Sequence, residues 1–527
     1  MSVLFTSISD TNTVSTNDVT NTFGELGFSV PKEHEQDYTT LLAALHDCAE
    51  SVAALDDFHP PTDIERFPRV KVHRPTADEN VLGHAWAHTF TIKDSMENNG
   101  LLSGKTACLK DCICVKGVPQ LLGTSIIDPW IPEADATVVR WVLESGAEIV
   151  GTAHCENWCQ STSSFSSAQG IVDNPFGKGY SAGGSTSGAA ALVGAGLVDI
   201  GIGADQGGSI RVPASLCGCV GLKPSHGLIP YTGIASNDTI DDHAGPLART
   251  VFEVAQCLDA VSGYDGIDDR SLGAPKHGST TFALDLKKQG KNGASGLRVG
   301  ILKEAFELSL LDAGYKKMVL QAAEKFRDIG AIVEEVSIPL HPTGNAFWTI
   351  QQRVSCYLAL MGLQHGRRQY HLTGLEDAKL PWTQDKFEKC FPTTQNIFLN
   401  GKYLVDKFPT LYAKGTNLCL KLRHEYEKAL ETYDVLITPT TPFVAPKHGS
   451  KTTPLATIAP TVGLTANTVQ FDATGQPAMS IPIGFLPAAD DAGVMLPVGM
   501  QIISGMWQDE KVLRAGHAWQ EHFDWKA

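Results

Sequence analysis

The sequence predicts an α/β protein in which helices cover both faces of a large β-sheet. From about Asn98 onward, short apolar segments typical of buried strands alternate with segments whose apolar residues recur at helical spacing. Such alternation is typical of a sheet that is covered on both sides. A hydrophobic content of 43% over 527 residues is ample for one large core, and no internal repeat or strong linker divides it.

The front of the chain differs from the rest. Residues up to about Thr22 are rich in Ser, Thr, Asn and Asp, which predicts a disordered or loosely docked tail. Apolar residues at helical spacing then predict a helix over Gln36–Leu55, and the Pro-containing stretch His59–Pro75 follows as a connection. We therefore expect an N-terminal tail and small helical region over residues 1–97 and one large domain over residues 98–527.

Within the large domain, periodicity predicts individual elements. Helices are expected over Asp135–Gly146, Tyr315–Ile329 and Asn417–Thr432. Strands are expected over Glu148–Thr152, Leu297–Leu302, Ile332–Ile338 and Asp434–Thr438.

Composition argues against several classes of partner. The net charge is −16 and no run of Lys or Arg exceeds a pair, which argues against a nucleic-acid-binding protein. The longest weakly polar stretch, Ala189–Ala204, is interrupted by glycines and Asp199 and does not predict a membrane span. Twelve cysteines in a long chain without a recognisable signal peptide indicate reduced thiols, so we expect a cytoplasmic protein.

One candidate nucleophile is Ser209, in the stretch Asp205–Ser215. The glycine pair before it lets successive backbone N–H groups converge, as in an oxyanion hole that stabilises negative charge on a carbonyl oxygen under attack. An ordinary glycine turn is an equally good interpretation of this stretch by itself.

Two further stretches carry a hydroxyl and an amine. Gly183–Ala190 places Ser185 after two glycines and before an alanine-rich segment, where a plain helix N-cap is the simplest interpretation. Lys110 lies in the mostly uncharged segment Thr106–Cys114. Burial there would lower the lysine pKa and favour the neutral amine, although Asp111 would oppose this if it faced the same site.

Together the three stretches resemble the amidase signature family. They occur in the family's order, with 75 positions between Lys110 and Ser185 and 24 between Ser185 and Ser209. The resemblance continues through Cys217–Ser225, Phe471–Pro477 and Leu496–Gln501. It implies the amidase signature fold, which is a large mixed β-sheet covered by helices on both faces.

The resemblance implies a role for each motif residue. Ser209 attacks the carbonyl and becomes acylated, Ser185 follows a cis peptide bond and bridges Ser209 to Lys110, and Lys110 is neutral at rest and accepts the proton. The oxyanion hole comes from the backbone N–H groups of Gln206, Gly207, Gly208 and Ser209. Asp205, Arg211, Thr186 and Ser187 are expected to hold these loops in place.

The resemblance also suggests a substrate class. Ala153–Trp158 and Ser163–Phe165 are similar to microbial amidases associated with nitrile metabolism, and urethanases belong to the same family. We therefore expect hydrolysis of a small amide or carbamate by a homodimer, with ester hydrolysis as a related activity. The predicted pocket walls are Trp158, Gln160, Phe165, Phe443 and Leu464.

Other functions fit the sequence less well. Acyl transfer is an enzymatic alternative, because amidotransferase subunits that release ammonia from glutamine share this fold and triad. A non-catalytic binding role is disfavoured because all three triad positions are intact. His84 and His88 could face one side of a helix as metal ligands, and His154, Cys155 and Cys159 could suggest zinc. Neither set has the spacing of a complete site, so no metal or cofactor is expected.

Overall fold

The computed structural model describes residues 8–127 and 129–527, and the chain forms two compact units, Met1–Pro60 and Pro61–Ala527. The first unit contains α1 (Thr16–Glu25), a 3₁₀ turn over Lys32–His34 and α2 (Glu35–Ala53). Helix α1 begins with a capping box between Ser15 and Asp18, a local signal for a helix start. The tail expected up to Thr22 is therefore helical from Thr16 onward, while residues 1–7 lie outside the described residues.

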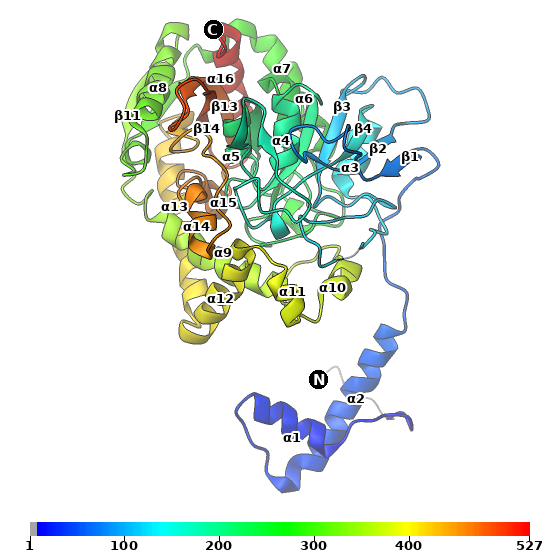
Figure 1. The fold of residues 1–527 in the computed structure, drawn as a ribbon. Helices are drawn as coiled ribbons and strands as arrows, with labels where there is room; N and C mark the ends of the chain where they lie inside the picture. The colour runs from blue at the N-terminus through cyan, green and yellow to red at the C-terminus, as the bar shows by residue number, and fades with distance from the viewer. Residues whose placement is uncertain (1–7, 128) are drawn as a thin grey trace. The chain divides into compact units, whose positions relative to one another are not determined.

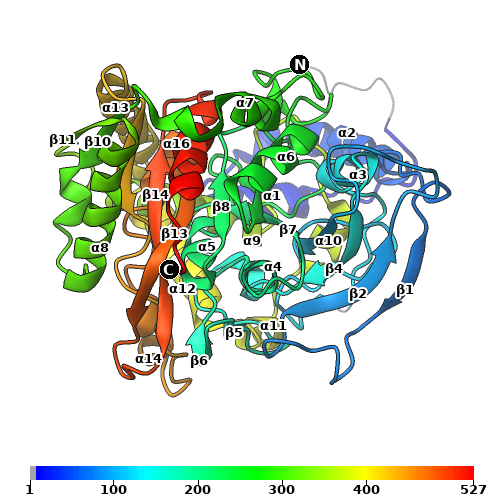
Figure 2. The same cartoon turned by 90° about the horizontal axis from the view of Figure 1, so that it is seen from above.

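The second unit is built around a 12-stranded sheet. Its strand order is β1-β2-β4-β3-β7-β9-β8-β13-β14-β12-β10-β11, running from β1 at one edge to β11 at the other (Figure 2). The strands are β1 (Arg69–His73), β2 (Trp86–Ile92), β3 (Thr106–Lys110), β4 (Glu148–Ala153), β7 (Ile200–Asp205), β8 (Val220–Lys223), β9 (His243–Ala248), β10 (Arg298–Leu302), β11 (Ile332–Val336), β12 (Val435–Pro439), β13 (Ala478–Pro487) and β14 (Met495–Ile503). Strands β5 (Asp173–Asn174) and β6 (Gly177–Ser181) form a separate hairpin.

The sheet is mixed. Strand β3 pairs in parallel with β4 and β7, and β10 pairs in parallel with β11 and β12. The strands between these two parallel groups, from β9 to β14, pair antiparallel. Parallel strands need crossover connections, and helices supply them here.

Helices surround the sheet (Figure 1). In the second unit they are α3 (Thr137–Glu144), α4 (Ser187–Gly194), α5 (Arg211–Cys217), α6 (Val251–Val261), α7 (Phe282–Gln289), α8 (Ala313–Glu324), α9 (Gly344–Leu360), α10 (Thr373–Lys379), α11 (Gln384–Glu388), α12 (Pro392–Lys407), α13 (Leu411–Leu430), α14 (Pro454–Ile458), α15 (Val469–Thr474) and α16 (Asp509–His522). Short 3₁₀ turns occupy Asn157–Cys159, Asp269–Ser271, Gly290–Ala294, Lys303–Phe306, Lys325–Ile329 and Ala459–Thr461.

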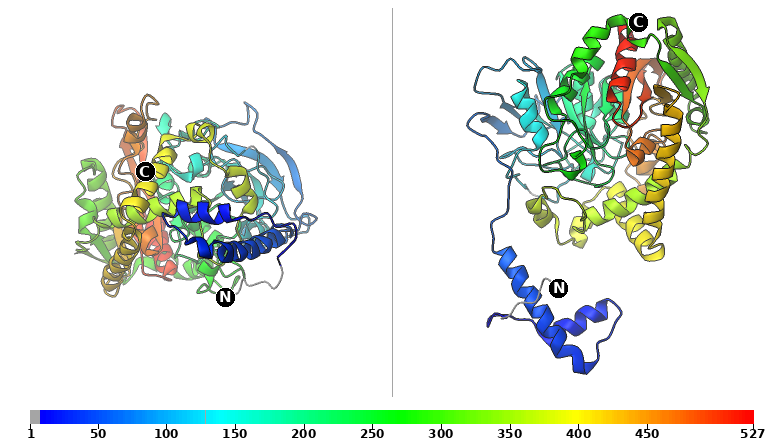
Figure 3. Two further views of the ribbon diagram at one scale, coloured as in Figure 1. Left: turned by 90° about the horizontal axis from the view of Figure 1, so that it is seen from below. Right: turned by 180° about the vertical axis from the view of Figure 1, so that it is seen from behind.

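Strand β13 shows that both faces of the sheet are covered. Met479 reaches Gly516 of α16, whereas the next residue, Ser480, lies with Ser215 of α5 around Gly499 of β14. Successive side chains of a strand point to opposite faces, so α5 and α16 pack on opposite sides of the sheet. Seen from behind, α16 (red) lies beside the green helices (Figure 3), and it contacts both α6 and α7.

The predicted α/β class is confirmed, and each predicted element of the second unit overlaps an observed one. The predicted boundary between residues 97 and 98 differs from the observed division, because β1 and β2 already belong to the main sheet. Strand β1 is an edge strand whose residues Arg69–His73 are half-buried or exposed. It therefore lacks the apolar run that marks the interior strands.

Among the described residues, no helix is both long enough and apolar enough to cross a membrane.

Candidate active site

The site begins at the carboxyl ends of two neighbouring parallel strands. Lys110 is the last residue of β3, and Asp205 is the last residue of β7, which pairs with it. The Lys110 side chain is fully buried. Its Nζ donates to Ser185 Oγ at 2.8 Å and to the carbonyl of Ala204 at 3.0 Å. Strand pairing thus fixes the lysine stem, and two hydrogen bonds fix its amine.

Ser185 lies directly before α4 and is fully buried. The Gly184–Ser185 peptide bond is cis, the isomer that the resemblance implies. A β-carbon at Gly184 would come within 2.7 Å of the Glu156 side chain, so this close approach requires glycine. The next residue, Thr186, donates its N–H to the carbonyl of Ser209 at 3.2 Å and so ties the Ser185 segment to the Ser209 loop.

Glu156 supports the Ser185 segment, a role that the sequence alone does not reveal. Its buried carboxylate accepts hydrogen bonds from the hydroxyls of Ser163, Ser166 and Ser187. Burial raises the pKa of Glu156, and these hydroxyl donors oppose that rise. Ser187, which we expected to hold the loop, therefore acts through this carboxylate. The glutamate lies within the Ala153–Trp158 motif, but nothing in the sequence indicates what it contacts.

Ser209 lies in the loop between β7 and α5 and is 8% exposed. The Asp205 carboxylate accepts from the N–H groups of Gly207 at 3.2 Å, Gly208 at 2.5 Å and Ile210 at 3.0 Å, which fixes the loop. Gly208 has φ = 128°, and a β-carbon there would lie 2.4 Å from Thr468 Oγ1. For two of the four predicted oxyanion-hole donors, Gly207 and Gly208, the acceptor in this structure is thus Asp205.

A buried ion network anchors the Ser209 loop to the far end of the chain. Arg211 contacts Asp205 at 3.0 Å and Asp472 at 2.5 Å, and all three side chains are fully buried. Arg211 also donates to the carbonyl of Thr468 at 2.9 Å. Although burial acts to raise the pKa of Asp205, its pairing with Arg211 prevails and lowers it. This carboxylate therefore stays ionised and holds the loop.

The neighbourhood of Lys110 differs from what we expected. Burial acts to lower its pKa, but electrostatic interaction with Cys159, then with Cys112, Cys155 and Asp205, raises it more, so the net direction is upward. We expected a lowered lysine pKa because the segment is uncharged in sequence. Cys155, Cys159 and Asp205, which are distant in sequence, contribute to the opposite outcome. Asp111 is turned away, since its carboxylate accepts from the N–H groups of Leu121 and Leu122 at 3.0 Å.

A cavity of about 250 Å³ opens beside Ser209. Of the five predicted wall residues, Gln160 lines it. Phe165 instead packs against Phe391 and His448, Leu464 is buried in an apolar cluster, and Phe443 packs on that same cluster. The residues that line the cavity are Cys159, Gln160, Ser161, Thr162, Gln206, Gly207, Ser209, Asn237, Trp348, Gln352, Arg353, Thr393, Ile458, Thr461, Val462, Gly463 and Thr465.

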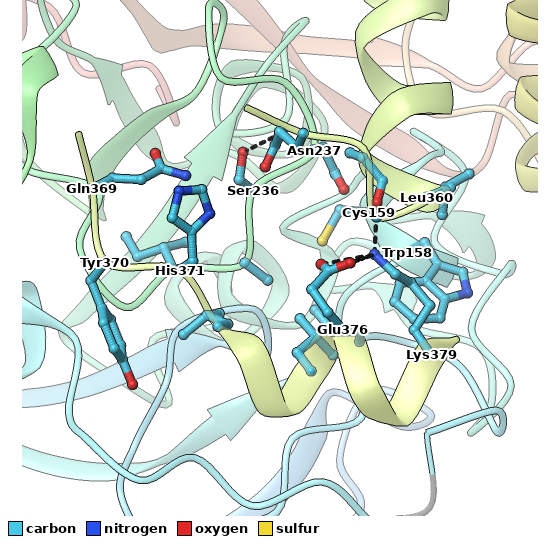
Figure 4. Close-up of a pocket in the computed structure, with 18 residues that line it drawn as sticks. Trp158, Cys159, Ser236, Asn237, Leu360, Gln369, Tyr370, His371, Glu376 and Lys379 are labelled. Atoms are coloured by element: carbon cyan, nitrogen blue, oxygen red, sulfur yellow. Dashed lines mark hydrogen bonds and ion pairs between the residues drawn. The ribbon is translucent and has the colours of Figure 1, made fainter. Parts of the chain in front are cut away.

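A second cavity of about 170 Å³ shares Cys159 and Asn237 with the first (Figure 4). Trp158, the remaining predicted wall residue, lines this second cavity. Glu376 and Lys379 form an ion pair at 2.7 Å on its wall. Since Ser209 does not line it, we take the first cavity as the candidate substrate site.

Helix α9 supplies wall residues that no sequence motif indicated. Trp348, Gln352 and Arg353 line the Ser209 cavity from this helix. Trp348 Nε1 also donates to the carbonyl of Gln206 at 2.9 Å, so the helix touches the Ser209 loop directly. No helix was predicted over Gly344–Leu360, and no local signal says that one face of this segment meets a loop more than 130 residues away.

The histidines considered as metal ligands do not converge. His88 lies in strand β2, so the helix on which a His84/His88 pair was considered is not formed. His154 Nδ1 bonds the backbone carbonyl of His84. Within residues 8–127 and 129–527, no three His, Cys, Asp or Glu side chains are placed to hold a metal ion.

Comparisons with known proteins identify the family of the chain. The family described as Amidase matches residues 77–513. The chain is 36% identical to an enantioselective amidase of Rhodococcus rhodochrous over 446 residues, covering 83% of this chain and 82% of that protein. It resembles the solved structure of a glutamyl-tRNA(Gln) amidotransferase component from Thermotoga maritima, with a TM-score of 0.65, 25% identity and coverage of 82% and 86%.

A second solved structure is similar to the same extent. The peptide amidase of Stenotrophomonas maltophilia matches with a TM-score of 0.64 and 25% identity, covering 81% of this chain and 84% of that one. The family match spans most of the chain and includes every segment of the candidate site. The chain therefore belongs to the amidase signature family of enzymes that act on carbon–nitrogen bonds.

Proposed function

We propose that this protein is an amidase that hydrolyses small amides or carbamates through Ser209, Ser185 and Lys110. The observation that carries the proposal is the 2.8 Å hydrogen bond from Lys110 Nζ to Ser185 Oγ, in a fully buried site whose neighbour Ser209 borders a cavity. An amine, a relay hydroxyl and an accessible hydroxyl are the parts that acyl transfer to serine requires.

In the first half of the reaction, Ser209 Oγ bonds to the substrate carbonyl carbon. Its proton passes to Ser185, whose own proton passes to neutral Lys110. The carbonyl electron pair moves onto oxygen, where it is stabilised by backbone N–H groups of the Gln206–Ser209 loop other than those of Gly207 and Gly208, which donate to Asp205. When the C–N bond breaks, Lys110 returns the proton through Ser185 to the leaving nitrogen, leaving an ester on Ser209. Water then attacks that ester by the same proton route and releases the acid.

The reaction requires the Ser209 hydroxyl to approach Ser185. Among the described residues, no hydrogen bond joins the Ser185 and Ser209 hydroxyls in this structure. Catalytic hydrogen bonds are often long before substrate binds and shorten in the Michaelis complex. The Thr186 N–H to Ser209 carbonyl bond, at 3.2 Å, holds the two backbones close enough for this approach.

Acyl transfer to an amine is the second candidate function. It is favoured by the similarity to the glutamyl-tRNA(Gln) amidotransferase component, with its TM-score of 0.65. The two functions differ in what the purified chain does alone. An amidase releases ammonia from a simple amide without a partner, whereas a transferase component would need its partner chains.

The test combines labelling with turnover. A fluorophosphonate probe should label the wild-type chain, and Ser209→Ala should prevent labelling. Ammonia release should then be measured for acetamide, benzamide, a long-chain amide and ethyl carbamate. Labelling with turnover of at least one neutral amide supports an amidase, and turnover of ethyl carbamate would extend it to urethanase activity. Absence of both labelling and turnover would overturn the proposal.

A further inference from the structure

Arg353 is the one cationic side chain among the described residues that line the Ser209 cavity, and no Asp or Glu lines it. Apart from Cys159, whose pKa is lowered by its hydrogen bonds to Cys112 and Cys155, the other lining residues are uncharged, and many are polar, such as Gln160, Asn237 and Gln352. A cavity meant for a purely apolar acyl group would normally be lined mostly by hydrophobic side chains. A single cation in a polar wall that holds no Asp or Glu points instead to a negative charge on the ligand.

The guanidinium has no carboxylate partner within the part of the chain that the structure describes. One of its Nη atoms donates to Gln352 Oε1 at 3.0 Å, and Gln352 Nε2 in turn donates to Gln160 Oε1 at 3.3 Å. By contrast, the buried guanidiniums of Arg211 and Arg270 each contact two aspartates. Buried cations are ordinarily paired, because removal from water is costly.

Burial lowers the pKa of the Arg353 guanidinium, and interaction with the nearby Cys356 offsets only part of this decrease. Because Arg353 is half-buried and donates to Gln352, solvent and that amide meet part of the cost of holding this charge, and no carboxylate in the described part of the chain pairs with it. A ligand carboxylate would supply the missing partner, and guanidinium groups match carboxylates in a bidentate geometry.

A second residue of the cavity wall carries a buried hydroxyl without a partner. Thr393 lines the cavity, and its buried Oγ1 has no hydrogen-bond partner in the structure. Thr393 is the second residue of α12, a 16-residue helix, so it lies at the end where free N–H groups carry positive partial charge. Arg353 and Thr393 thus provide two donors, on two helices that pack together.

We propose that the preferred substrates carry a carboxylate, which Arg353 and Thr393 bind while Ser209 attacks the amide at the other end. This inference rests on the proposed amidase function and narrows its substrate class to monoamides of dicarboxylic acids and similar anionic amides. Hydrolysis of such a monoamide consumes water and releases ammonia and the dicarboxylate. Gln352 is a positioning residue, because it acts on the ligand through Arg353.

The experiment compares substrates of matched size and different charge. Ammonia release is measured for malonamate, succinamate and glutaramate beside propionamide, butyramide and valeramide, which replace each carboxylate by a methyl group. We expect the wild type to favour the anionic member of at least one pair by tenfold or more in kcat/KM. Preference for the neutral member in all three pairs would overturn the proposal.

Variants of Arg353 then test whether the preference for anionic amides comes from this cavity. Arg353→Met should lower the ratio of anionic to neutral kcat/KM by about 100-fold, since the charged partner is lost. The ratio for Arg353→Lys should lie between those of the wild type and Arg353→Met, because lysine keeps the charge but cannot form the bidentate contact of a guanidinium. The matched control is Arg298→Met, which removes a surface arginine paired with Glu334 and should leave the ratio unchanged. An unchanged ratio in Arg353→Met would contradict the proposal.

A binding measurement separates this proposal from the proposed function. Succinate should bind the Ser209→Ala variant in calorimetry, and the double variant with Arg353→Met should bind it at least tenfold more weakly. Succinate binding without amide turnover would keep the anion site and reject the amidase. Turnover of neutral amides without succinate binding would support the amidase and reject the anion site. If Arg353→Met does not fold, the wild-type pairs and Arg353→Lys decide the outcome.

Discussion

The proposed triad and the cavity wall are built in different ways. Lys110, Ser185 and Ser209 lie within about 100 residues of one another, at the end of β3, directly before α4 and in the loop after β7. Much of the opposite wall comes from α9, α12 and the 458–465 segment, between about 140 and 260 residues beyond Ser209. Triad residues are buried or nearly so, whereas Arg353 is half-buried at the cavity surface.

This difference separates the residues expected to carry out the reaction from those expected to select the substrate. The triad depends on strand pairing and on glycines whose β-carbons would collide with their surroundings, as at Gly184 and Gly208. Few alternative residues fit such positions. The cavity wall is held by helices whose packing constrains one face and leaves the other to the ligand. Substitutions in the first region should therefore abolish the reaction, and substitutions in the second should change which amide is used.

The largest expected effect is loss of the nucleophile. Ser209→Ala should lower kcat by a factor on the order of 10⁶, because alanine fits the loop but has no attacking oxygen. Lys110→Met should be nearly as damaging, since it keeps the stem and removes the proton acceptor. Ammonia release from the best neutral amide is the measurement, with thermal unfolding to check the fold. Substantial residual turnover in Ser209→Ala would move the nucleophile elsewhere.

Removal of the relay hydroxyl should cost less. We expect Ser185→Ala to lower kcat by about 10²–10⁴-fold, because a water molecule can partly replace the relay between Lys110 and Ser209. Burst-phase kinetics with an activated ester would show whether acylation is the step that slows. Near-normal acylation in this variant would mean that Ser209 transfers its proton by another route.

The raised lysine pKa predicts an alkaline pH dependence. Charges around Lys110 favour its ammonium form, yet the mechanism uses the neutral amine. The neutral fraction, and with it kcat/KM, should increase about tenfold for each pH unit between about pH 6 and pH 9. Rates for a neutral amide, whose own charge is constant in this range, give the profile. A flat or falling profile would indicate that another group is the base.

The smallest expected effect tests which of the predicted wall residues contact the substrate. Gln160→Ala should change KM for a small amide by a few fold, because Gln160 lines the Ser209 cavity and contacts Gln352. Phe165→Leu should cost about 1 kcal/mol of stability and leave KM unchanged, because Phe165 packs against Phe391 and His448 instead. Equal changes in KM for both variants would extend the substrate wall to Phe165.

The fold class could be predicted because its signals are local. Periodicity located α2, α3, β4, β10, β11, α13 and β12, since a strand or helix with a buried side repeats apolar residues at its own spacing. Strands β1 and β2 were not predicted from this periodicity. Edge strand β1 is half solvent-exposed and its membership in the sheet depends on pairing with β2, which no local pattern reveals.

In the candidate site, too, some features follow from local sequence and others only from tertiary contacts. Lys110, Ser185 and Ser209 were predicted as a triad because the three motifs together resemble the amidase signature family, whereas each stretch alone also fits an ordinary turn or helix cap. Tertiary structure alone decided what surrounds them: the charges that raise the Lys110 pKa, the Glu156 carboxylate under Ser185, and the Arg353 guanidinium facing the cavity. These contacts join segments far apart in sequence. Their energies depend on distance and burial, which packing sets.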